Sequence, residues 1–335
     1  MSPDPDSRPE AIAAFLAHHG YGAARATPLA QDASLRRYLR LSGGLRPAVL
    51  MDAPPPEDVR PFLRIAAHLA AIGLSVPEII AADERTGLLL EEDLGDDLFP
   101  AVLTTGSAPA LYDAAVDALV ALQREATPLG LPAWDAAAMA QATLGVLFDW
   151  WWPASFGSPA PPCARADVSA ALASMLTPLV AGPACLVHRD FFAGNLVWLP
   201  QRDGVRRVGI LDFQGAAIGH PAYDLVSLLQ DARRDIPAAI ESRGIDRFLA
   251  ARPELDPTAF RQAYAVCAAQ RHLRVATQWV RLARREGRPQ YLNHGPHTWR
   301  LLDVALRHSA TTSLAAALDR WIPPARRGNP PGLAA

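Results

Sequence analysis

The sequence predicts an α+β fold of two lobes, in which a small β-rich lobe precedes a larger helical one. Two patterns favour this fold: short apolar runs bounded by turn residues are concentrated before residue 93, and long stretches of helical periodicity follow. The change falls at Asp93-Leu94-Gly95. We therefore expect an N-terminal lobe over residues 1–93, a C-terminal lobe over 94–322 and a flexible, Pro-rich tail over 323–335.

The predicted N-terminal lobe contains two helices and two pairs of strands. A short helix ends at Gly20, and a longer one with apolar residues at helical spacing ends at Gly73. Turn residues separate the strands of each pair, at Ser42-Gly43-Gly44 and at Asp83-Glu84-Arg85-Thr86. The segment before the first helix is polar, which predicts disorder. The expected elements are helices at 11–19 and 57–71 and strands at 35–41, 48–51, 78–82 and 87–91.

The predicted C-terminal lobe is helical except for one β-hairpin. Residues 196–199 and 206–211 are apolar-rich, and a turn containing Asp203-Gly204 separates them. A hairpin here returns the end of its second strand to the start of its first. The helical patterns cover residues 108–125, 135–152, 166–180, 221–232, 257–286 and 296–307.

Composition limits the possible classes of protein. A chain of 335 residues with 50% hydrophobic content can bury a large core, and its net charge of −2 gives no indication of a nucleic-acid partner. No apolar run is long enough to cross a bilayer, and the acidic, polar start is unlike a signal peptide. The three cysteines lack metal-ligand spacing, which favours buried thiols in a reducing cytoplasm. We expect a cytoplasmic monomer that binds small molecules.

The residues that carry chemistry lie at the two ends of the hairpin. His188-Arg189-Asp190 precedes Asn195, and Asp212 follows the second apolar run. One aspartate can orient a hydroxyl nucleophile, while an asparagine and a second aspartate can hold Mg²⁺ against the phosphates of ATP. The pattern therefore predicts phosphoryl transfer from ATP, with Asp190 as the catalytic base and Asn195 and Asp212 as the Mg²⁺ ligands.

Lysine is absent from the chain, and all 32 basic residues are arginine. A kinase site normally places a lysine on the phosphates, so an arginine must replace it here or the contact is missing. Arg37 and Arg40 are the candidates, and strand alternation favours Arg37 over Arg40. The alternative is that these arginines form a solvated basic strand edge. Glu57 opens the long helix, where it either pairs with that arginine or serves the helix dipole alone.

The segments around these residues resemble the aminoglycoside phosphotransferase / choline kinase superfamily. The resemblance rests on residues 187–195, 211–214 and 219–229. Further segments are similar to the bacterial anomeric kinases of N-acetylmuramate and N-acetylglucosamine, and the likeness spans roughly residues 10–322. It implies the bilobal, protein-kinase-like fold of the aminoglycoside phosphotransferases. The further segments are residues 32–38, 49–55, 87–97 and 270–272.

The resemblance also implies where the nucleotide binds. The loop at residues 31–37 would lie over the phosphates, with Ser34 and backbone N–H groups cradling oxygen atoms. The segment from Glu91 to Leu94, including Glu92, would be the hinge that offers its backbone to adenine. His188 is expected to brace the catalytic loop, and Asp224 to accept backbone N–H bonds from it.

The acceptor pocket is expected among Arg189, Phe192, Gln214 and Arg271. Arg189 either faces the substrate or ties the loop down. Arg271 either holds a lactyl carboxylate by bidentate contact or forms a salt bridge within the helical lobe. The chain departs from the family pattern at Phe192 and at His297, where histidine and arginine are frequent. Trp150, Trp151 and Trp152 point in different directions on a helix, so core packing is favoured over stacking on a sugar.

We expect a Mg²⁺-dependent kinase that transfers the γ-phosphoryl of ATP to the anomeric C1 hydroxyl of N-acetylmuramate and N-acetylglucosamine. The α-1-phosphates would feed peptidoglycan recycling. One alternative is another acceptor of the superfamily, such as an aminoglycoside, choline or a homoserine-type alcohol. The other is an ATP-binding pseudokinase, although such proteins usually lack the base or a metal ligand, and this chain has all three residues.

Overall fold

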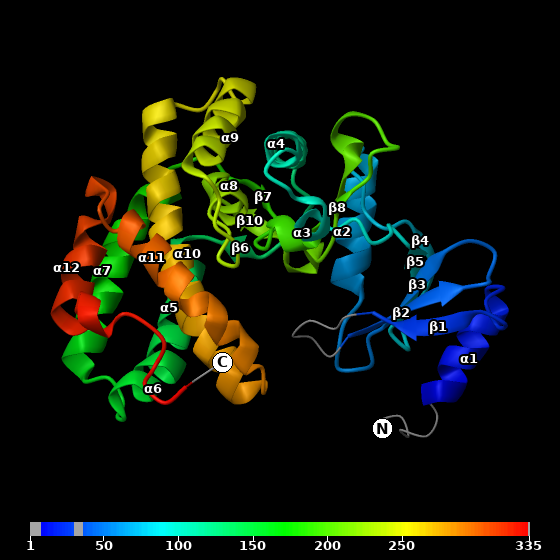
Figure 1. The fold of residues 1–335 in the computed structure, drawn as a ribbon, viewed down its shortest axis with the longest axis horizontal. Helices are drawn as coiled ribbons and strands as arrows, with labels where there is room; N and C mark the ends of the chain where they lie inside the picture. Colours follow the sequence, from blue (N-terminus) through cyan, green and yellow to red (C-terminus); the bar gives the residue numbers. More distant parts are fainter. Residues whose placement is uncertain (1–7, 30–35, 334–335) are drawn as a thin grey trace. The chain divides into compact units, whose positions relative to one another are not determined.

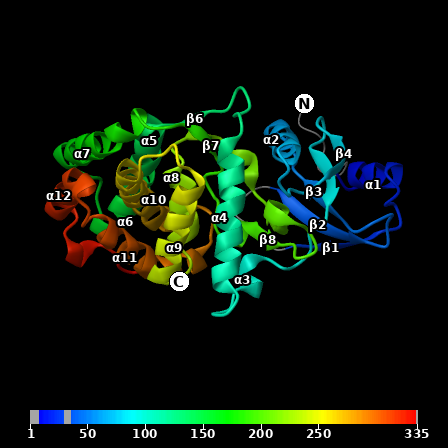
Figure 2. The ribbon, with the colours of Figure 1, turned by 90° about the horizontal axis from the view of Figure 1, so that it is seen from above.

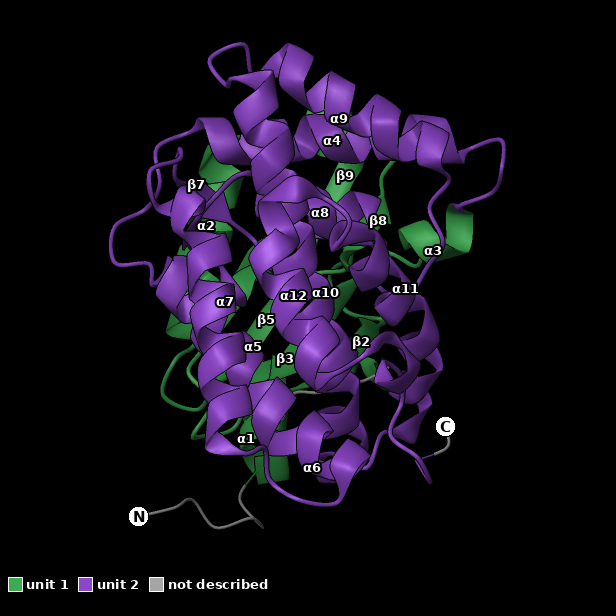
Figure 3. Ribbon diagram, turned by 90° about the vertical axis from the view of Figure 1, so that its left-hand side faces the viewer, with its two compact units in different colours: residues 1–102, 195–214 green, residues 103–194, 215–335 purple. Residues whose placement is uncertain are grey.

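The computed structural model describes residues 8–29 and 36–333, and the chain divides into two compact units (Figure 3). The first unit comprises residues 1–102 and 195–214, and the second comprises residues 103–194 and 215–335. The first is built on an antiparallel sheet and the second is largely helical (Figure 1). The predicted fold class, a β-rich lobe followed by a helical one, is confirmed.

The sheet of the first unit has five strands in the order β1-β2-β3-β5-β4, all antiparallel. Its central strand β3 is buried at every residue, which explains why Ala-Val-Leu-Met is an unbroken apolar run. Four strands were predicted. The fifth, β1, was missed because its four residues are all exposed and lack an alternating pattern. The strands are β1 Arg25–Pro28, β2 Arg37–Ser42, β3 Ala48–Asp52, β4 Ile79–Asp83 and β5 Leu88–Glu92.

The first unit also contains two longer helices. Helix α1, Arg8–His18, buries Phe15 and Leu16 in a cluster with the strand residues Leu50 and Leu90. Helix α2, Arg60–Ala71, buries an apolar stripe at helical spacing and ends before Gly73, whose φ of 82° closes the turn. A short helix, α3 Phe99–Val102, follows the sheet.

The predicted hairpin is present and belongs to the first unit. Strands β8 Leu196–Trp198 and β9 Val208–Ile210 pair antiparallel. Bridges from Ser75 to Gly209 and from Leu98 to Val197 attach the hairpin to the N-terminal segment. The compact unit therefore differs from the predicted lobe of residues 1–93, because these long-range pairings add a segment that is distant in the sequence.

The second unit is organised around the long helix α10, Pro257–Arg285, which packs against α5, α8 and α11 (Figure 2). Helix α8, Ala222–Leu229, is buried at all of its residues. A small sheet of order β6-β10-β7 precedes it, with β6 Ala133–Trp134, β7 Cys185–Val187 and β10 Ala217–Gly219. The remaining helices are α4 Ala108–Arg124, α5 Ala136–Val146, α6 Trp152–Phe156, α7 Pro162–Val180, α9 Ala238–Ala251, α11 Gly295–Ala305 and α12 Thr312–Trp321.

Three expectations for the helical unit need correction. The pattern over residues 135–152 is α5 followed by a π-helical turn, Leu147–Trp151, rather than one α-helix. Helices α9 and α12 were not predicted. The tail after residue 322 is attached to the unit: the buried Arg327 pairs with Asp303 and Asp319. No helix of residues 8–29 and 36–333 is long and apolar enough to cross a membrane.

Candidate active site

The predicted catalytic loop follows strand β7 and is held by the carboxylate of Asp224 in helix α8. The N–H groups of His188 and Arg189 donate to the two Asp224 oxygens at 2.6 and 2.9 Å. This is the contact predicted for Asp224. Burial raises the pKa of the Asp224 carboxyl, while the charge of His188 and the two N–H bonds act in the opposite direction. A buried carboxylate thus sets the backbone of the loop.

His188 and Arg189 both serve the geometry of this loop. The buried His188 ring accepts the N–H of Asp190 at its Nδ1 (3.3 Å) and packs edge-to-face against Phe191. Arg189 has a φ of 74°, which a non-glycine residue rarely adopts. Its guanidinium lies 4.0 Å from the centre of the Trp134 ring and donates to the Gly215 carbonyl. Of the two roles left open for Arg189, these contacts favour tying the loop down.

Asp190 is exposed at the end of this braced segment. Its charge acts on three arginines of the second unit: Arg189, Arg271 and Arg274. Arg274 is anchored by the Tyr223 hydroxyl at 3.1 Å and the Gln278 side chain at 3.0 Å. An exposed carboxylate that lies among the positive charges of arginines is suited to orient a neutral hydroxyl group.

The hairpin of the first unit carries the two predicted metal ligands. The Leu211 N–H donates to the Asn195 carbonyl at 2.9 Å, so the end of β9 returns beside Asn195, as predicted. Asp212 has a φ of 60°, and the next residue, Phe213, is buried and stacks on Phe62 of α2. This packing of Phe213 holds Asp212 in its strained conformation.

The donor set of this hairpin fits a magnesium ion. Asn195 and Asp212 offer amide and carboxylate oxygens, the ligands that a hard cation prefers, and Mg²⁺ completes its shell with water and phosphate. Asp212 is exposed, which leaves room for those additional ligands. Gln214 was expected to lie beside the substrate. Its side-chain amide donates to Asp212 Oδ1 at 2.6 Å, so it orients the carboxylate of the predicted metal ligand.

Strand β2 contains Arg37 and Arg40, and Arg36 directly precedes it. Each of these three arginines pairs with a different acidic residue. Arg37, the favoured phosphate-binding candidate, pairs with Asp52, and Arg40 pairs with Asp93 and Asp96. Arg36 is buried and pairs with Glu57 at 3.1 Å. The charges of Arg36 and Asp212 both act on the Tyr38 hydroxyl, whose pKa is raised by burial. Arg36 was not considered as a candidate from the sequence, and Ser34 lies outside the described residues.

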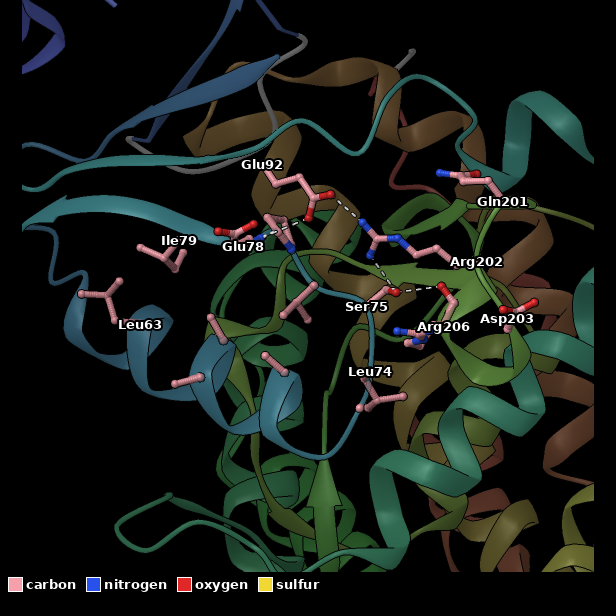
Figure 4. Close-up of a pocket in the computed structure, with 16 residues that line it drawn as sticks. Leu63, Leu74, Ser75, Glu78, Ile79, Glu92, Gln201, Arg202, Asp203 and Arg206 are labelled. Carbon is pink, nitrogen blue, oxygen red and sulfur yellow. Dashed lines mark hydrogen bonds and ion pairs between the residues drawn. The ribbon is translucent and has the colours of Figure 1, made fainter. Parts of the chain in front are cut away.

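The expected hinge leads out of strand β5. The Glu92 N–H donates to the Glu78 carbonyl at 2.8 Å, and the Glu92 carboxylate pairs with Arg202 at 2.5 Å. Figure 4 shows this ion pair in a pocket of about 690 Å³, where Arg202 also donates to Ser75. The side chain of Leu94 lies next to Gly209 of the hairpin. A Cβ atom at position 209 would be 3.0 Å from Cδ1 of Leu94.

The residues of the predicted acceptor pocket are brought together only in part. Phe192 is buried and lies under the guanidinium of Arg233, which no sequence pattern singled out. Arg271 is 2% exposed and donates to Ser227 Oγ at 2.7 Å, and its Nε and Nη1 are buried without a hydrogen-bond partner among the described residues. Trp151 and Trp152 are core residues, as predicted.

The fold and the two motif-bearing segments define a kinase-like phosphotransferase. The chain matches the profile of the phosphotransferase enzyme family over residues 25–260, and it belongs to this family. The fold is also that of solved phosphotransferases. A choline/ethanolamine kinase family protein from Mesorhizobium loti aligns with a TM-score of 0.65 at 16% identity, over 93% of this chain and 99% of that one. An aminoglycoside phosphotransferase bound to AMP-PNP and hygromycin B aligns at 0.61 and 17% identity, over 89% and 98%.

More similar sequences come from a single group of proteins. The N-acetylmuramate/N-acetylglucosamine kinase of Caulobacter vibrioides is 38% identical, over 94% of this chain and 97% of its own. The protein of the same name from Pseudomonas aeruginosa is 35% identical over 83% of each chain. The one from Neisseria meningitidis is 31% identical over 86% and 88%.

Proposed function

We propose that this protein is an ATP-dependent kinase of N-acetylmuramate and N-acetylglucosamine. The observation that carries the proposal is the similarity to kinases of these two sugars along 94% of the chain, and the chain contains Asp190, Asn195 and Asp212 in the pattern expected for phosphoryl transfer. The product is the sugar α-1-phosphate, an intermediate of cell-wall recycling. The reaction requires ATP, so the cytoplasm is the expected compartment.

In the proposed reaction Asp190 orients the anomeric hydroxyl and accepts its proton. The sugar oxygen then forms a bond to the γ-phosphorus of ATP, the bond from that phosphorus to the bridging oxygen breaks, and ADP leaves. Asn195 and Asp212 would hold Mg²⁺, which neutralises charge on the phosphate oxygens when bound. Gln214 keeps the Asp212 carboxylate oriented through its hydrogen bond.

For the remaining nucleotide contacts we propose Arg36, with Ser34 of the preceding loop, at the phosphates. The pair of Arg36 with Glu57 supports this choice, because it ties a buried cation to the residues before helix α2 in the manner of a kinase lysine. Leu94 would offer its backbone to adenine. The N–H of Glu92 is already bonded to Glu78, so Glu92 would border the adenine rather than donate to it.

On the acceptor side we propose that Phe192 borders the sugar and that Arg271 supplies positive charge near it, while Arg189, expected at the substrate, holds the loop in place. Arg271 is buried and its charge interacts with that of Asp190, so it acts through the electric field rather than by a bidentate contact.

The test is ³¹P NMR of the protein with Mg²⁺-ATP and either sugar, beside an Asp190→Asn variant. We expect a sugar-1-phosphate signal with the wild type and a kcat lower by about 10³-fold in the variant, because general base catalysis is lost. Asp203→Asn, which removes a carboxylate from the exposed turn of the hairpin, is the matched control and should leave turnover unchanged.

Full turnover by Asp190→Asn would refute the role of Asp190. ATP binding without product from either sugar would refute the proposed acceptors, and it would favour another hydroxyl acceptor or a protein without turnover.

A further inference from the structure

Arg233 is an arginine whose guanidinium meets aromatic rings beside the catalytic loop. It lies in the segment that follows helix α8, and its Cζ is 4.2 Å from the centre of the Phe192 ring. The rings of Trp279 and Tyr291 lie at 5.3 and 5.9 Å and are themselves stacked. Phe192 is two residues from Asp190 in the sequence, so the guanidinium of Arg233 contacts a residue of the segment that carries Asp190.

The backbone that carries Arg233 is held on several sides. The Arg233 N–H donates to the buried Asp231 carboxylate at 2.9 Å. The ring of His297 contacts the Asp231 carbonyl through Nε2 and Asp235 through Nδ1, both at 3.0 Å. Thr298 donates to the Ala232 carbonyl. The segment is therefore anchored to α11. This anchoring fixes the position of the Arg233 side chain before a ligand binds, which lowers the entropic cost of binding.

The guanidinium of Arg233 has no hydrogen-bond acceptor or ion-pair partner among the described residues, and it is partly exposed. Two acids lie two positions from Arg233 on the same segment: the carboxylate of Asp231 is buried and accepts the Arg233 N–H, and Asp235 pairs with His297. Burial and the charge of Arg233 lower the pKa of His294. Arg271, by contrast, is enclosed and bonded to Ser227.

We propose that Arg233, held on the Phe192, Trp279 and Tyr291 rings, binds a carboxylate of the acceptor. This inference rests on the proposed function, in which one of the two acceptors, N-acetylmuramate, carries a lactyl carboxylate that N-acetylglucosamine lacks. The planar, doubly donating guanidinium suits a carboxylate, and the stacked rings keep its hydrogen-bond donors free at the edge. Arg233 would then determine the preference between the two sugars without taking part in phosphoryl transfer.

The experiment compares three acceptors: N-acetylmuramate, its methyl ester and N-acetylglucosamine. They are assayed with the wild type, Arg233→Gln and Arg234→Gln. We expect Arg233→Gln to lower kcat/KM for N-acetylmuramate by about 30-fold, mainly through KM, because one charge-assisted contact is lost. The values for the ester and for N-acetylglucosamine should stay within about threefold. Arg234→Gln removes a charge from the adjacent position and should leave all three unchanged.

The ester makes the test independent of the stability of the variant. In the wild type, kcat/KM should be lower for the methyl ester than for N-acetylmuramate, by the same factor by which Arg233→Gln lowers kcat/KM for N-acetylmuramate. In Arg233→Gln, N-acetylmuramate and its ester should have equal kcat/KM. Equal kcat/KM for acid and ester in the wild type, or an equal loss on both sugars in Arg233→Gln, would overturn the inference. Turnover of N-acetylglucosamine alone by the wild type would also overturn it. Absence of turnover with any sugar would instead refute the proposed function.

Discussion

At the scale of single residues, backbone strain coincides with the motif residues. Among the described residues other than glycine, Arg189 and Asp212 have positive φ, of 74° and 60°. Such conformations cost free energy and persist where surrounding contacts hold them. Here Asp224 and Trp134 hold Arg189, and the stacking of Phe213 on Phe62 holds the residue next to Asp212. The two strained positions thus mark the segments proposed to carry out phosphoryl transfer.

Glu91 provides a prediction at this scale. It is buried in strand β5, and desolvation raises its pKa from the ordinary 4.5 to about 8, although Arg36 acts in the opposite direction. Between about pH 5 and 8 the folded protein therefore retains a proton that the unfolded chain has lost. The free energy of unfolding should fall in this window as pH rises, by about 1.4 kcal/mol per pH unit relative to Glu91→Gln.

Urea unfolding of both proteins at pH 5, 6, 7 and 8 measures this difference. Curves that stay parallel would mean that Glu91 is ionised in the folded state throughout, with Arg36 as its effective partner.

At the scale of elements, the hairpin β8–β9 was predicted because its features are local. Two apolar runs and the Asp203-Gly204 turn suffice to bring Leu211 beside Asn195. The long pattern at residues 135–152 was predicted less well. Residues 147–151 form a π-helical turn that places Trp151 against Trp299 and Phe156, and periodicity alone does not reveal one extra residue in a turn.

The β4–β5 hairpin offers a prediction about an element. Gly87 has a φ of 70°, and a Cβ there would lie 2.0 Å from the Ala53 carbonyl oxygen, an atom of the backbone. Gly73 has a similar φ of 82° with nothing within 4 Å of the added Cβ. We expect Gly73→Ala to destabilise the protein by about 1 kcal/mol and Gly87→Ala by about 3 kcal/mol or more, since the clash adds to the strain.

Thermal unfolding monitored by circular dichroism at equal protein concentration compares the two variants. Equal losses in melting temperature would show that the Ala53 carbonyl moves aside at little cost.

At the scale of the whole molecule, the two units are not two continuous stretches of chain. Residues 195–214 belong with the N-terminal sheet because their strands bridge to Ser75 and Leu98. The second unit likewise includes the C-terminal segment, which a Pro- and Gly-rich composition predicted to be flexible. Trp151 donates to the Gly328 carbonyl, and Asn329 donates to the Leu292 carbonyl. Composition predicts the local conformational preference of the tail, whereas these contacts depend on residues that are distant from the tail in the sequence.

Truncation tests the role of that segment. Removal of residues 323–335 deletes Arg327, whose buried guanidinium joins Asp303 of α11 to Asp319 of α12, and it exposes the buried Ile322. We expect a loss of about 2–4 kcal/mol in the stability of the second unit, because two carboxylates lose their cation and a hydrogen bond to Trp151 is lost.

Truncation after Asn329 is the control, since it keeps all of these contacts, and it should unfold like the full chain in a urea titration. Equal stability of both truncated proteins would refute the structural role of the segment.

The sequence by itself determined the fold class and the hairpin and supplied the proposed catalytic aspartate and metal ligands, because these depend on short spacings and on periodicity within single elements. Only the tertiary structure decided which residues surround each arginine side chain. Arg36 and Arg37 are adjacent, and the register of β2 with β3 turns one toward Glu57 and the other toward Asp52. Arg233 lies in an irregular segment, and its aromatic neighbours come from positions 192, 279 and 291. Side-chain direction and long-range neighbours follow from packing, which no local pattern records.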